Sequence, residues 1–208
     1  MKRKELIKVV MFSGGYDSTL VAYKALTESS TPILLHHINI IDINGRWIPE
    51  RIACGKLTRV LAEITRPFSY TESTIDFSSM LRVGSDEDLV LLTSARITHD
   101  LELEYNKVII LEGTIKSDFE NGPMEERANK RGSIEEFFKR CAWMTRTPII
   151  EFPVVHLTKK EVLLSLPEEL RINCFYCRSP NPKYGFAPCG DCVTCKQIEE
   201  ISNANYEK

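Results

Sequence analysis

The amino-acid sequence predicts an α/β fold with a parallel sheet, and three observations support this prediction. Short apolar runs alternate with longer stretches whose apolar residues recur every three or four positions, the pattern of strands joined by crossover helices. A glycine-rich turn directly follows the first apolar run. The 208 residues suffice for one sizeable domain and a small appendage. We therefore expect an α/β domain over 1–170 and a cysteine-rich segment with a C-terminal helix over 171–208.

Each expected element has a pattern of its own. Strands are expected where apolar residues run together, at 6–12, 32–41, 68–75, 108–111 and 148–155. Helices are expected where apolar residues recur at helical spacing, from Thr19 onward and over 50–65, 86–105 and 133–144. Thr158, with Glu161 three residues later, predicts a further helix that ends near Pro167. The polar stretch 116–132 predicts a loop or a lid.

Composition and charge exclude several classes of protein. Hydrophobic residues make up 43% and charged residues 27% of the chain, which excludes a wholly disordered or fibrous protein. The formal net charge of -2 provides no overall basic field for non-specific nucleic-acid binding. Every apolar run is far shorter than the roughly 20 residues of a membrane-spanning helix, and no secretory signal pattern is present. We therefore expect a cytoplasmic protein.

The turn at 13–19, Ser-Gly-Gly-Tyr-Asp-Ser-Thr, is the first candidate site. It lies between the first strand and the first helix, where open α/β sheets bind ligands. Its glycines allow a tight turn, and its hydroxyls and the helix N-terminus offer hydrogen-bond donors to a phosphate. Asp17 would repel a polyanion, so we expect a Mg²⁺ ion between this carboxylate and the phosphates. The alternative is a plain turn whose aspartate and serine only cap the helix.

Cysteines near the C-terminus form the second candidate site. Five of the seven cysteines gather in a stretch that is rich in proline and glycine and too poor in apolar residues to fold by burial alone. Cys189, Cys192 and Cys195 recur at three-residue spacing. Either Cys174 or Cys177 would complete a four-thiolate zinc site, with an iron–sulfur cluster or free thiols as the alternatives. The two remaining cysteines are expected in the core: Cys54 and Cys141.

The glycine turn resembles the Ser-Gly-Gly-x-Asp-Ser signature of the PP-loop ATP pyrophosphatases, and its place after the first strand matches as well. The resemblance implies a Rossmann-like domain of the adenine nucleotide alpha hydrolase type. It also implies that the protein splits ATP into AMP and pyrophosphate while it adenylates a carboxylate or carbonyl oxygen. A nitrogen or sulfur nucleophile then displaces AMP, which is a far better leaving group than a carboxylate oxygen.

Together, the two candidate sites resemble the 7-cyano-7-deazaguanine synthases over nearly the whole chain. The similarity rests on the segments 157–162, 177–180 and 188–195 and on Gly113 and Asp118. Members of that family convert 7-carboxy-7-deazaguanine, ammonia and ATP into the nitrile through an amide, for queuosine-type modification of tRNA or for DNA. The resemblance implies an ATP-dependent carbon–nitrogen ligase that uses Mg²⁺ and Zn²⁺, spans no membrane and binds no nucleic acid directly. Family members often form homodimers.

The resemblance also implies roles for single residues. The ATP phosphates would be held by Ser13, Gly14, Gly15, Asp17, Ser18, Thr19 and Lys159. The catalytic residues would be Asp17, Ser18 and Asp118. Zinc would be bound by Cys177, Cys189, Cys192 and Cys195. A surface salt bridge for Lys159 and an ordinary loop carboxylate at Asp118 are the alternatives.

The sequence departs from the family pattern at several positions. Ile115 and Asp88 stand where asparagines are typical, and 121–130 lacks the usual Tyr-Pro-Asp-Cys-Arg stretch. His36 and His37 replace an aspartate and a tyrosine, and we expect a packed histidine rather than a nucleotide contact at His37. Two other functions therefore stay open. One is a relative that stops at the amide or adenylates another acceptor, and the other is a nucleotide- and zinc-binding module without catalysis.

Overall fold

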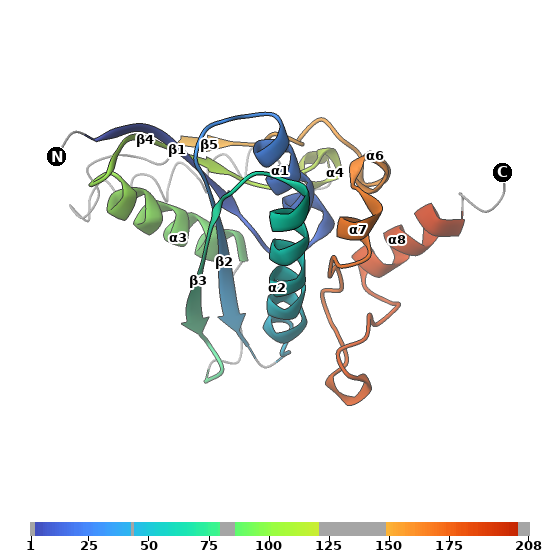
Figure 1. Ribbon diagram of the computed structural model, residues 1–208. Coiled ribbons are helices and arrows are strands. Elements are labelled where there is room, and N and C mark those ends of the chain that lie inside the picture. The colour runs from blue at the N-terminus through green and yellow to red at the C-terminus, as the bar shows by residue number, and fades with distance from the viewer. Residues whose placement is uncertain (1–2, 43, 80–85, 121–148, 204–208) are drawn as a thin grey trace.

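The computed structural model describes residues 3–42, 44–79, 86–120 and 149–203 (Figure 1). Its centre is a five-stranded sheet in the order β3-β2-β1-β4-β5, in which every neighbouring pair is parallel. The strands are β1 (Lys4–Met11), β2 (Ile33–Ile41), β3 (Ser69–Asp76), β4 (Tyr105–Leu111) and β5 (Ile149–Glu151). The predicted parallel α/β fold is confirmed.

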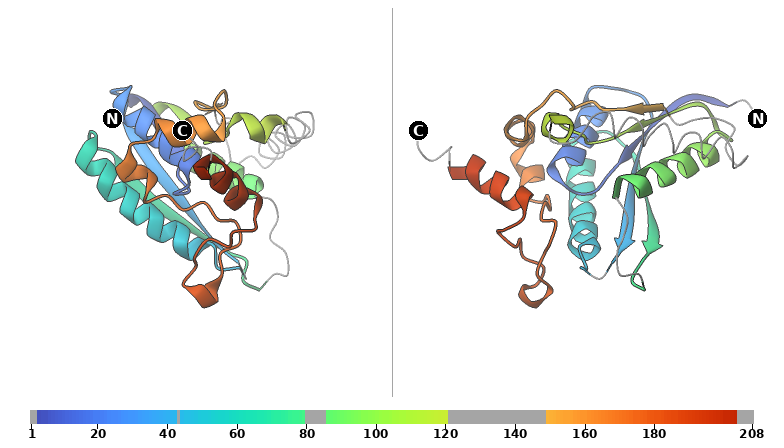
Figure 2. Two further views of the ribbon diagram at one scale, coloured as in Figure 1. Left: turned by 90° about the vertical axis from the view of Figure 1, so that its right-hand side faces the viewer. Right: turned by 180° about the vertical axis from the view of Figure 1, so that it is seen from behind.

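Helices cover both faces of the sheet (Figure 1 and Figure 2). They are α1 (Tyr16–Thr27), α2 (Trp47–Ile64), α3 (Asp86–Leu101), α4 (Lys116–Glu120), α6 (Lys159–Ser165), α7 (Glu168–Arg171), the 3₁₀ helix η1 (Pro182–Tyr184) and α8 (Val193–Asn203). Side chains of α1, α2, α6 and α7 share one core with one face of the sheet, and α3 packs on the other face. Among the helices of the described residues, none is long and apolar enough to cross a membrane.

The central strands are apolar on both sides because both faces of the sheet are covered. Val9, Val10 and Ile110 are fully buried, and neighbouring residues alternate between the two cores. β3 lies at one edge of the sheet, and its side chains alternate between exposed and half-buried. Since the carboxyl ends of adjacent parallel strands lie together, β1 and β4 deliver the segments that follow them to one place, which becomes the candidate site.

The start of α6 agrees with the prediction. The backbone N–H of Thr158 donates to Glu161 Oε2 at 2.7 Å, and the N–H of Glu161 donates to Thr158 Oγ1 at 3.3 Å. This reciprocal capping box satisfies two amides that have no partner within the helix. α6 ends at Ser165, and Pro167 then serves as the N-cap of α7.

Several expected boundaries differ from the structure, and three of the differences have a clear physical cause. α3 ends at Leu101 rather than near 105, because Tyr105 already pairs with Lys4 in the ladder between β4 and β1. β5 ends at Glu151, since Pro153 has no amide hydrogen with which to continue the ladder.

The third difference is the loop expected from Lys116 onward. That prediction is wrong for the first residues, which form α4, because Asp118 Oδ2 accepts from the backbone N–H of Ile115 at 3.0 Å and stabilises the turn there. The rest of the predicted loop, the helix predicted over 133–144 and Cys141 lie outside the described residues.

Two adjacent histidines of β2 are buried in the sheet. His36 forms hydrogen bonds with the hydroxyls of Thr71 and Ser73 at 2.8 and 3.0 Å, and these bonds join β2 to β3. His37 Nδ1 donates to the carbonyl oxygen of Phe12 at 2.9 Å. His37 is only 1% exposed, as expected for a packed histidine.

Stability should fall in mild acid because of His36. Burial lowers the pKa of His36 from 6.5 to about 4. The unfolded chain therefore binds more protons than the folded chain between about pH 6.5 and about pH 4, and the free energy of unfolding should decrease as the pH falls through that window. Denaturant titrations of the wild type and of His36→Gln should show a shallower pH dependence for the variant. Parallel pH curves for the two proteins would contradict this role of His36.

Candidate functional site

A cleft of about 540 Å³ opens at the carboxyl ends of β1 and β4. Its walls come from the turn after β1, the starts of α2, α3 and α6, the segment after β4, and the cysteine-rich segment with α8. Six residues predicted for ATP binding or catalysis line it: Ser13, Gly15, Asp17, Ser18, Asp118 and Lys159. The other two lie behind the cleft wall. Gly14 packs against α2, and Thr19 is fully buried.

The turn after β1 leaves backbone amides available at the cleft. Gly14 has a positive φ of 75°, and a Cβ there would lie 3.0 Å from Cys54 Sγ and 3.2 Å from the carbonyl oxygen of Glu50. Glycine is therefore the residue that this turn accepts. Gly15 is the N-cap of α1, and it has no side chain that could accept from the first amides of the helix. The first amides of α1 thus keep their capacity to bind an anion such as phosphate.

Two serine hydroxyls are fixed beside these amides. The Oγ atoms of Ser13 and Ser18 lie 3.0 Å apart. The backbone N–H of Ser13 donates to Ser18 Oγ at 3.2 Å, and the Ser18 hydroxyl lies 3.2 Å from the carbonyl oxygen of Gly15, to which it donates. Because these bonds hold the hydroxyls in place, little ordering is needed when a ligand binds.

An ion pair joins Asp17 of α1 to Lys159 of α6, two residues far apart in the sequence. Lys159 Nζ lies 2.5 Å from Asp17 Oδ2. Burial raises the pKa of Asp17, while the charge of Lys159 acts in the opposite direction. Within the described part of the chain, Asp17 Oδ1 is buried and has no hydrogen-bond partner. A carboxylate with one uncommitted oxygen that faces a phosphate-binding turn suits a divalent cation.

The segment after β4 comes extremely close to the turn. A Cβ on Gly113 would lie 2.6 Å from the backbone nitrogen of Ser18 and 2.9 Å from the carbonyl carbon of Asp17. Glu112 and Asp118, on either side of Gly113, both line the cleft. Asp118 also accepts the Ile115 amide, so its carboxylate both stabilises α4 and faces the cleft.

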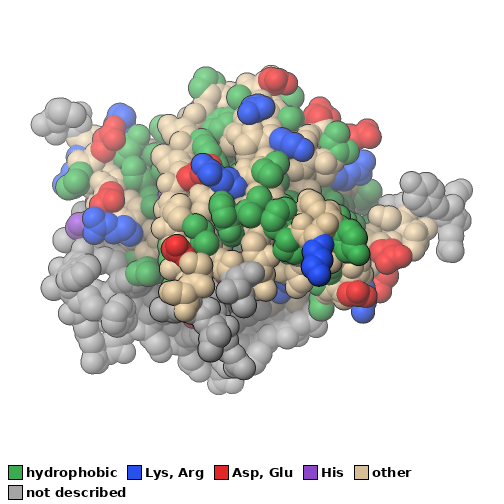
Figure 3. Space-filling view, turned by 90° about the horizontal axis from the view of Figure 1, so that it is seen from below, with side chains coloured by type: hydrophobic (Ala, Val, Ile, Leu, Met, Phe, Trp, Pro, Cys, Tyr) green, Lys and Arg blue, Asp and Glu red, His purple; other side chains and the backbone are tan. Residues whose placement is uncertain are grey.

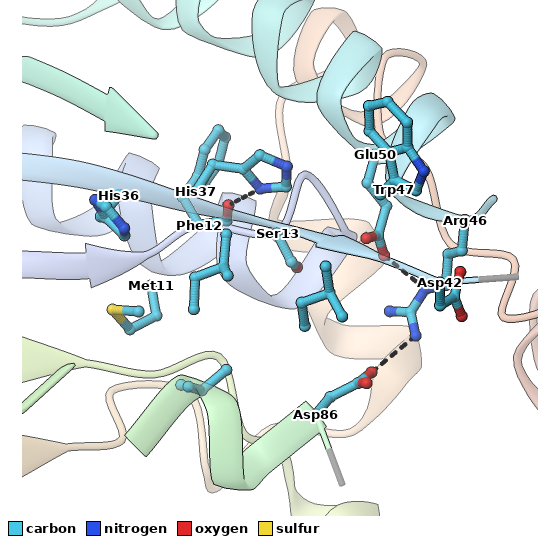
Figure 4. Close-up of a pocket in the computed structure, with 13 residues that line it drawn as sticks. Met11, Phe12, Ser13, His36, His37, Asp42, Arg46, Trp47, Glu50 and Asp86 are labelled. Carbon is cyan, nitrogen blue, oxygen red and sulfur yellow. Dashed lines mark hydrogen bonds and ion pairs between the residues drawn. The ribbon is translucent and has the colours of Figure 1, made fainter. Parts of the chain in front are cut away.

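A second pocket of about 160 Å³ adjoins the cleft at the ends of β1 and β2 (Figure 4). Met11, Phe12 and Trp47 give it apolar walls. Arg46 lies across its mouth, 2.7 Å from Glu50 and 2.9 Å from Asp86. Burial raises the pKa of Glu50 to about 7 although Arg46 opposes this change. The lining of the pocket is largely apolar and includes several charged side chains, a combination that suits a nucleoside base.

The cysteine-rich segment closes the other side of the cleft. The backbone N–H of Phe175 donates to the carbonyl oxygen of Gly14 at 2.9 Å. The Tyr176 ring stacks on the Tyr16 ring with centroids 5.5 Å apart and an interplanar angle of 22°. The segment is therefore attached directly to the glycine turn after β1 and to the first residue of α1.

Four cysteines form a cluster that can bind a metal ion: the Sγ atoms of Cys177, Cys189, Cys192 and Cys195 all lie within 4.8 Å of one another. Backbone N–H groups point at the sulfurs, with Cys189 N 3.2 Å from Cys177 Sγ and Cys192 N 3.3 Å from Cys189 Sγ. Such bonds favour thiolates, which are the form that binds metals. Cys174 is not in the cluster, because its Sγ contacts Thr19 Oγ1 and the carbonyl oxygen of Leu170 at 3.5 and 3.4 Å.

Sequence reasoning missed several cleft residues. No sequence pattern assigns Arg46 and Glu50 to the cleft, because only the tertiary structure brings the start of α2 to it. Tyr176 and Arg178 lie on either side of Cys177, a predicted metal ligand. This position in the sequence could have identified them as candidate cleft residues. Glu112 directly follows an apolar strand, which is where ligand-binding side chains of parallel sheets occur.

Comparison with known proteins found a solved structure with a similar fold. A solved structure, the U34-tRNA thiolase NcsA from Methanococcus maripaludis with its [4Fe-4S] cluster, matches with a TM-score of 0.52 at 15% identity. The match covers 99% of this chain and 66% of that chain, so this chain spans just under two thirds of the length of that protein. The likeness shows the fold.

A weaker match is a predicted subunit of a tRNA methyltransferase from Methanocaldococcus jannaschii, with a TM-score of 0.44 at 18% identity over 77% of this chain and 74% of that chain. No family model and no curated protein matches the sequence.

Gly113→Ala should damage the cleft. The added methyl group would collide with the backbone of Ser18, which cannot move without shifting α1, so we expect a loss of about 1–3 kcal/mol of stability. Gly55→Ala is the matched control. A Cβ there meets nothing within 4 Å, and alanine in the interior of α2 should add about 0.5–1 kcal/mol. Thermal denaturation of both variants tests the difference, and equal melting temperatures would contradict it.

Cys177→Ser should lose most of the bound metal, because it removes one of the four clustered sulfurs. Cys174→Ser should keep the metal, since Cys174 lies outside the cluster. Elemental analysis of the purified proteins gives the metal content per chain. Equal metal loss in both variants would show that the cluster includes Cys174.

Proposed function

We propose that this chain is an ATP-dependent carbon–nitrogen ligase of the 7-cyano-7-deazaguanine synthase type, which adenylates a carboxylate and releases pyrophosphate. The observation that carries the proposal is the convergence of free α1 amides, Asp17 and Lys159 on one cleft beside a base-sized pocket. A triphosphate needs amides and a cation, and its base needs a flat apolar pocket. In this chain, the α1 amides with Asp17 lie beside the apolar pocket.

In this proposal ATP lies with its base against Trp47 and its phosphates on the turn after β1. Ser13, Gly15 and Ser18 and the first amides of α1 hold the phosphates, and Asp17 would hold Mg²⁺, which neutralises charge on the departing pyrophosphate. Lys159 would exchange its ion pair with Asp17 for a phosphate oxygen when the cation arrives. The remaining predicted residues, Gly14 and Thr19, shape the turn from behind.

The acceptor enters from the side of Asp118. A carboxylate oxygen of 7-carboxy-7-deazaguanine attacks the α-phosphorus, the bond to pyrophosphate breaks, and an acyl adenylate forms. Ammonia then attacks the acyl carbon, loses a proton and displaces AMP to give the amide. A second ATP adenylates the amide oxygen in the same way. Loss of the remaining amide protons and departure of AMP give the nitrile, and Asp118 would accept a proton in these steps.

Zn²⁺ is the metal that the cluster fits best. Four thiolates around a single tetrahedral ion with bonds of about 2.3 Å lie about 3.8 Å apart. The Cys189 and Cys195 sulfurs are 4.0 Å apart, and no pair in the cluster exceeds 4.8 Å. A four-iron cluster such as that of the tRNA thiolase contains four iron and four sulfide ions between its cysteines, so it requires wider spacing.

Ile115, Asp88, His36 and His37 do not line the larger cleft, and the departure at 121–130 lies outside the described residues. Ile115 is fully buried in the core, and His37 is buried, bonded to the carbonyl oxygen of Phe12 and part of the lining of the smaller pocket. Figure 3 shows basic and acidic side chains interspersed on the face seen from below, in line with the net charge of -2. Both observations favour a small-molecule acceptor over direct nucleic-acid binding, and a homodimer remains part of the proposal.

Asp17→Asn should abolish the release of pyrophosphate, because it removes the charge that would hold Mg²⁺. We expect a loss of at least about 100-fold in product formation with the metal content of the cysteine cluster unchanged. Mass spectrometry after incubation with ATP, Mg²⁺, ammonium and 7-carboxy-7-deazaguanine detects AMP, the amide and the nitrile.

The wild type should form all three products. Amide alone would indicate a protein that stops after the first activation, and full activity of Asp17→Asn would remove Asp17 from the site. Absence of AMP from the metal-loaded wild type would contradict the proposed function.

A further inference from the structure

Three cationic side chains of the described residues line the cleft: Arg46, Lys159 and Arg178. Arg46 is committed to Glu50 and Asp86, and Lys159 is committed to Asp17. Arg178 is exposed, and no carboxylate of the described part of the chain forms an ion pair with it. One guanidinium in the cleft therefore remains available for an anionic ligand.

The cysteine cluster lies next to the backbone that carries the guanidinium of Arg178. Arg178 directly follows Cys177, one of the four clustered cysteines. The charge of Arg178 reaches the turn after β1, where it acts with Lys159 against the rise in the pKa of Asp17 that burial causes. Arg178 and the turn after β1 thus line the same cleft.

An aromatic surface lies beside Arg178. Tyr176, two residues earlier, is half-buried, lines the cleft and stacks on Tyr16. Phe175 lines the same wall. A flat ring can lie against such a surface, and a group attached to that ring can reach the guanidinium.

We infer that Arg178 binds the carboxylate of a flat aromatic acid that lies against Tyr176, and so selects the acid as the first acceptor. The inference rests on the proposed function and assigns its acceptor site to the cysteine-rich segment. The planar guanidinium binds a carboxylate through two parallel hydrogen bonds, which a lysine cannot reproduce. It also offsets the repulsion between the carboxylate and the triphosphate, which must approach each other before adenylation.

The same contact explains how acid and amide would be told apart. The acid is an anion, while the amide is neutral and gains much less from a guanidinium. Arg178 should therefore determine the affinity for the acid and contribute little to the affinity for the amide. Phosphate binding should depend on it much less, because the α1 amides, Ser13 and Ser18 provide the main phosphate contacts.

Calorimetric titration of the metal-loaded protein tests the inference with three ligands: 7-carboxy-7-deazaguanine, its amide and ATP with Mg²⁺. Arg178→Gln should weaken binding of the acid by roughly 10- to 100-fold and change binding of the amide and of ATP by less than about threefold. Arg178→Lys keeps the charge and should recover part of the lost affinity. Lys183→Gln is the matched control, because it removes the same charge from an exposed position of the same segment outside the cleft.

The outcomes separate this inference from the proposed function. Equal binding of the acid by the wild type and Arg178→Gln would overturn the role of Arg178 and leave the ligase intact. An equal loss for acid and amide, or loss of metal from both Arg178 variants, would show that the arginine is structural. A wild type that binds ATP but not the acid would remove the proposed acceptor, and the role of Arg178 with it.

Discussion

The contact between the segment after β4 and the first turn of α1 constrains the whole site. Gly113 lies so close to Ser18 that a single methyl group would separate them. The parallel pairing of β1 with β4 brings these two backbones together, and they can come into contact because Gly113 has no side chain. Because the contact holds α1 against the ends of the strands, the amides of α1, Asp17 and Asp118 open into one cleft. The turn proposed to bind phosphate and the region proposed to bind the acceptor become neighbours in this way.

The cysteine-rich segment provides a wall of the cleft that the sheet does not form. The segment from Cys174 to Cys195 is poor in apolar side chains, so a bound metal would supply much of its folding free energy. The segment nevertheless forms a wall of the cleft, through the bond from Phe175 to Gly14 and the stacking of Tyr176 on Tyr16. Metal binding at the cluster would therefore be coupled to ligand binding in the cleft, because loss of the metal would release residues that line the cleft.

Local patterns in the sequence predicted most of the fold and only part of the site. The apolar runs around Val9 and Ile110 identified the central strands, and the Thr158 and Glu161 pair identified the start of α6. The short polar helix α4 was missed, since its stability comes from one carboxylate bond to the Ile115 amide and not from an apolar face. Sequence spacing grouped three of the clustered cysteines, but only the resemblance favoured Cys177 over Cys174. Arg46 could not be assigned to the cleft, because tertiary packing alone brings α2 to it.

Transfer of oxygen from acceptor to nucleotide tests the central claim most directly. The metal-loaded protein would be incubated with ATP, Mg²⁺, ammonium and 7-carboxy-7-deazaguanine whose carboxylate carries ¹⁸O, and the nucleotides would be analysed by mass spectrometry. Attack of the carboxylate on the α-phosphorus, followed by displacement of AMP, places ¹⁸O in AMP. We predict labelled AMP together with unlabelled pyrophosphate. Unlabelled AMP, or ADP with inorganic phosphate, would contradict adenylation of the acceptor in this cleft.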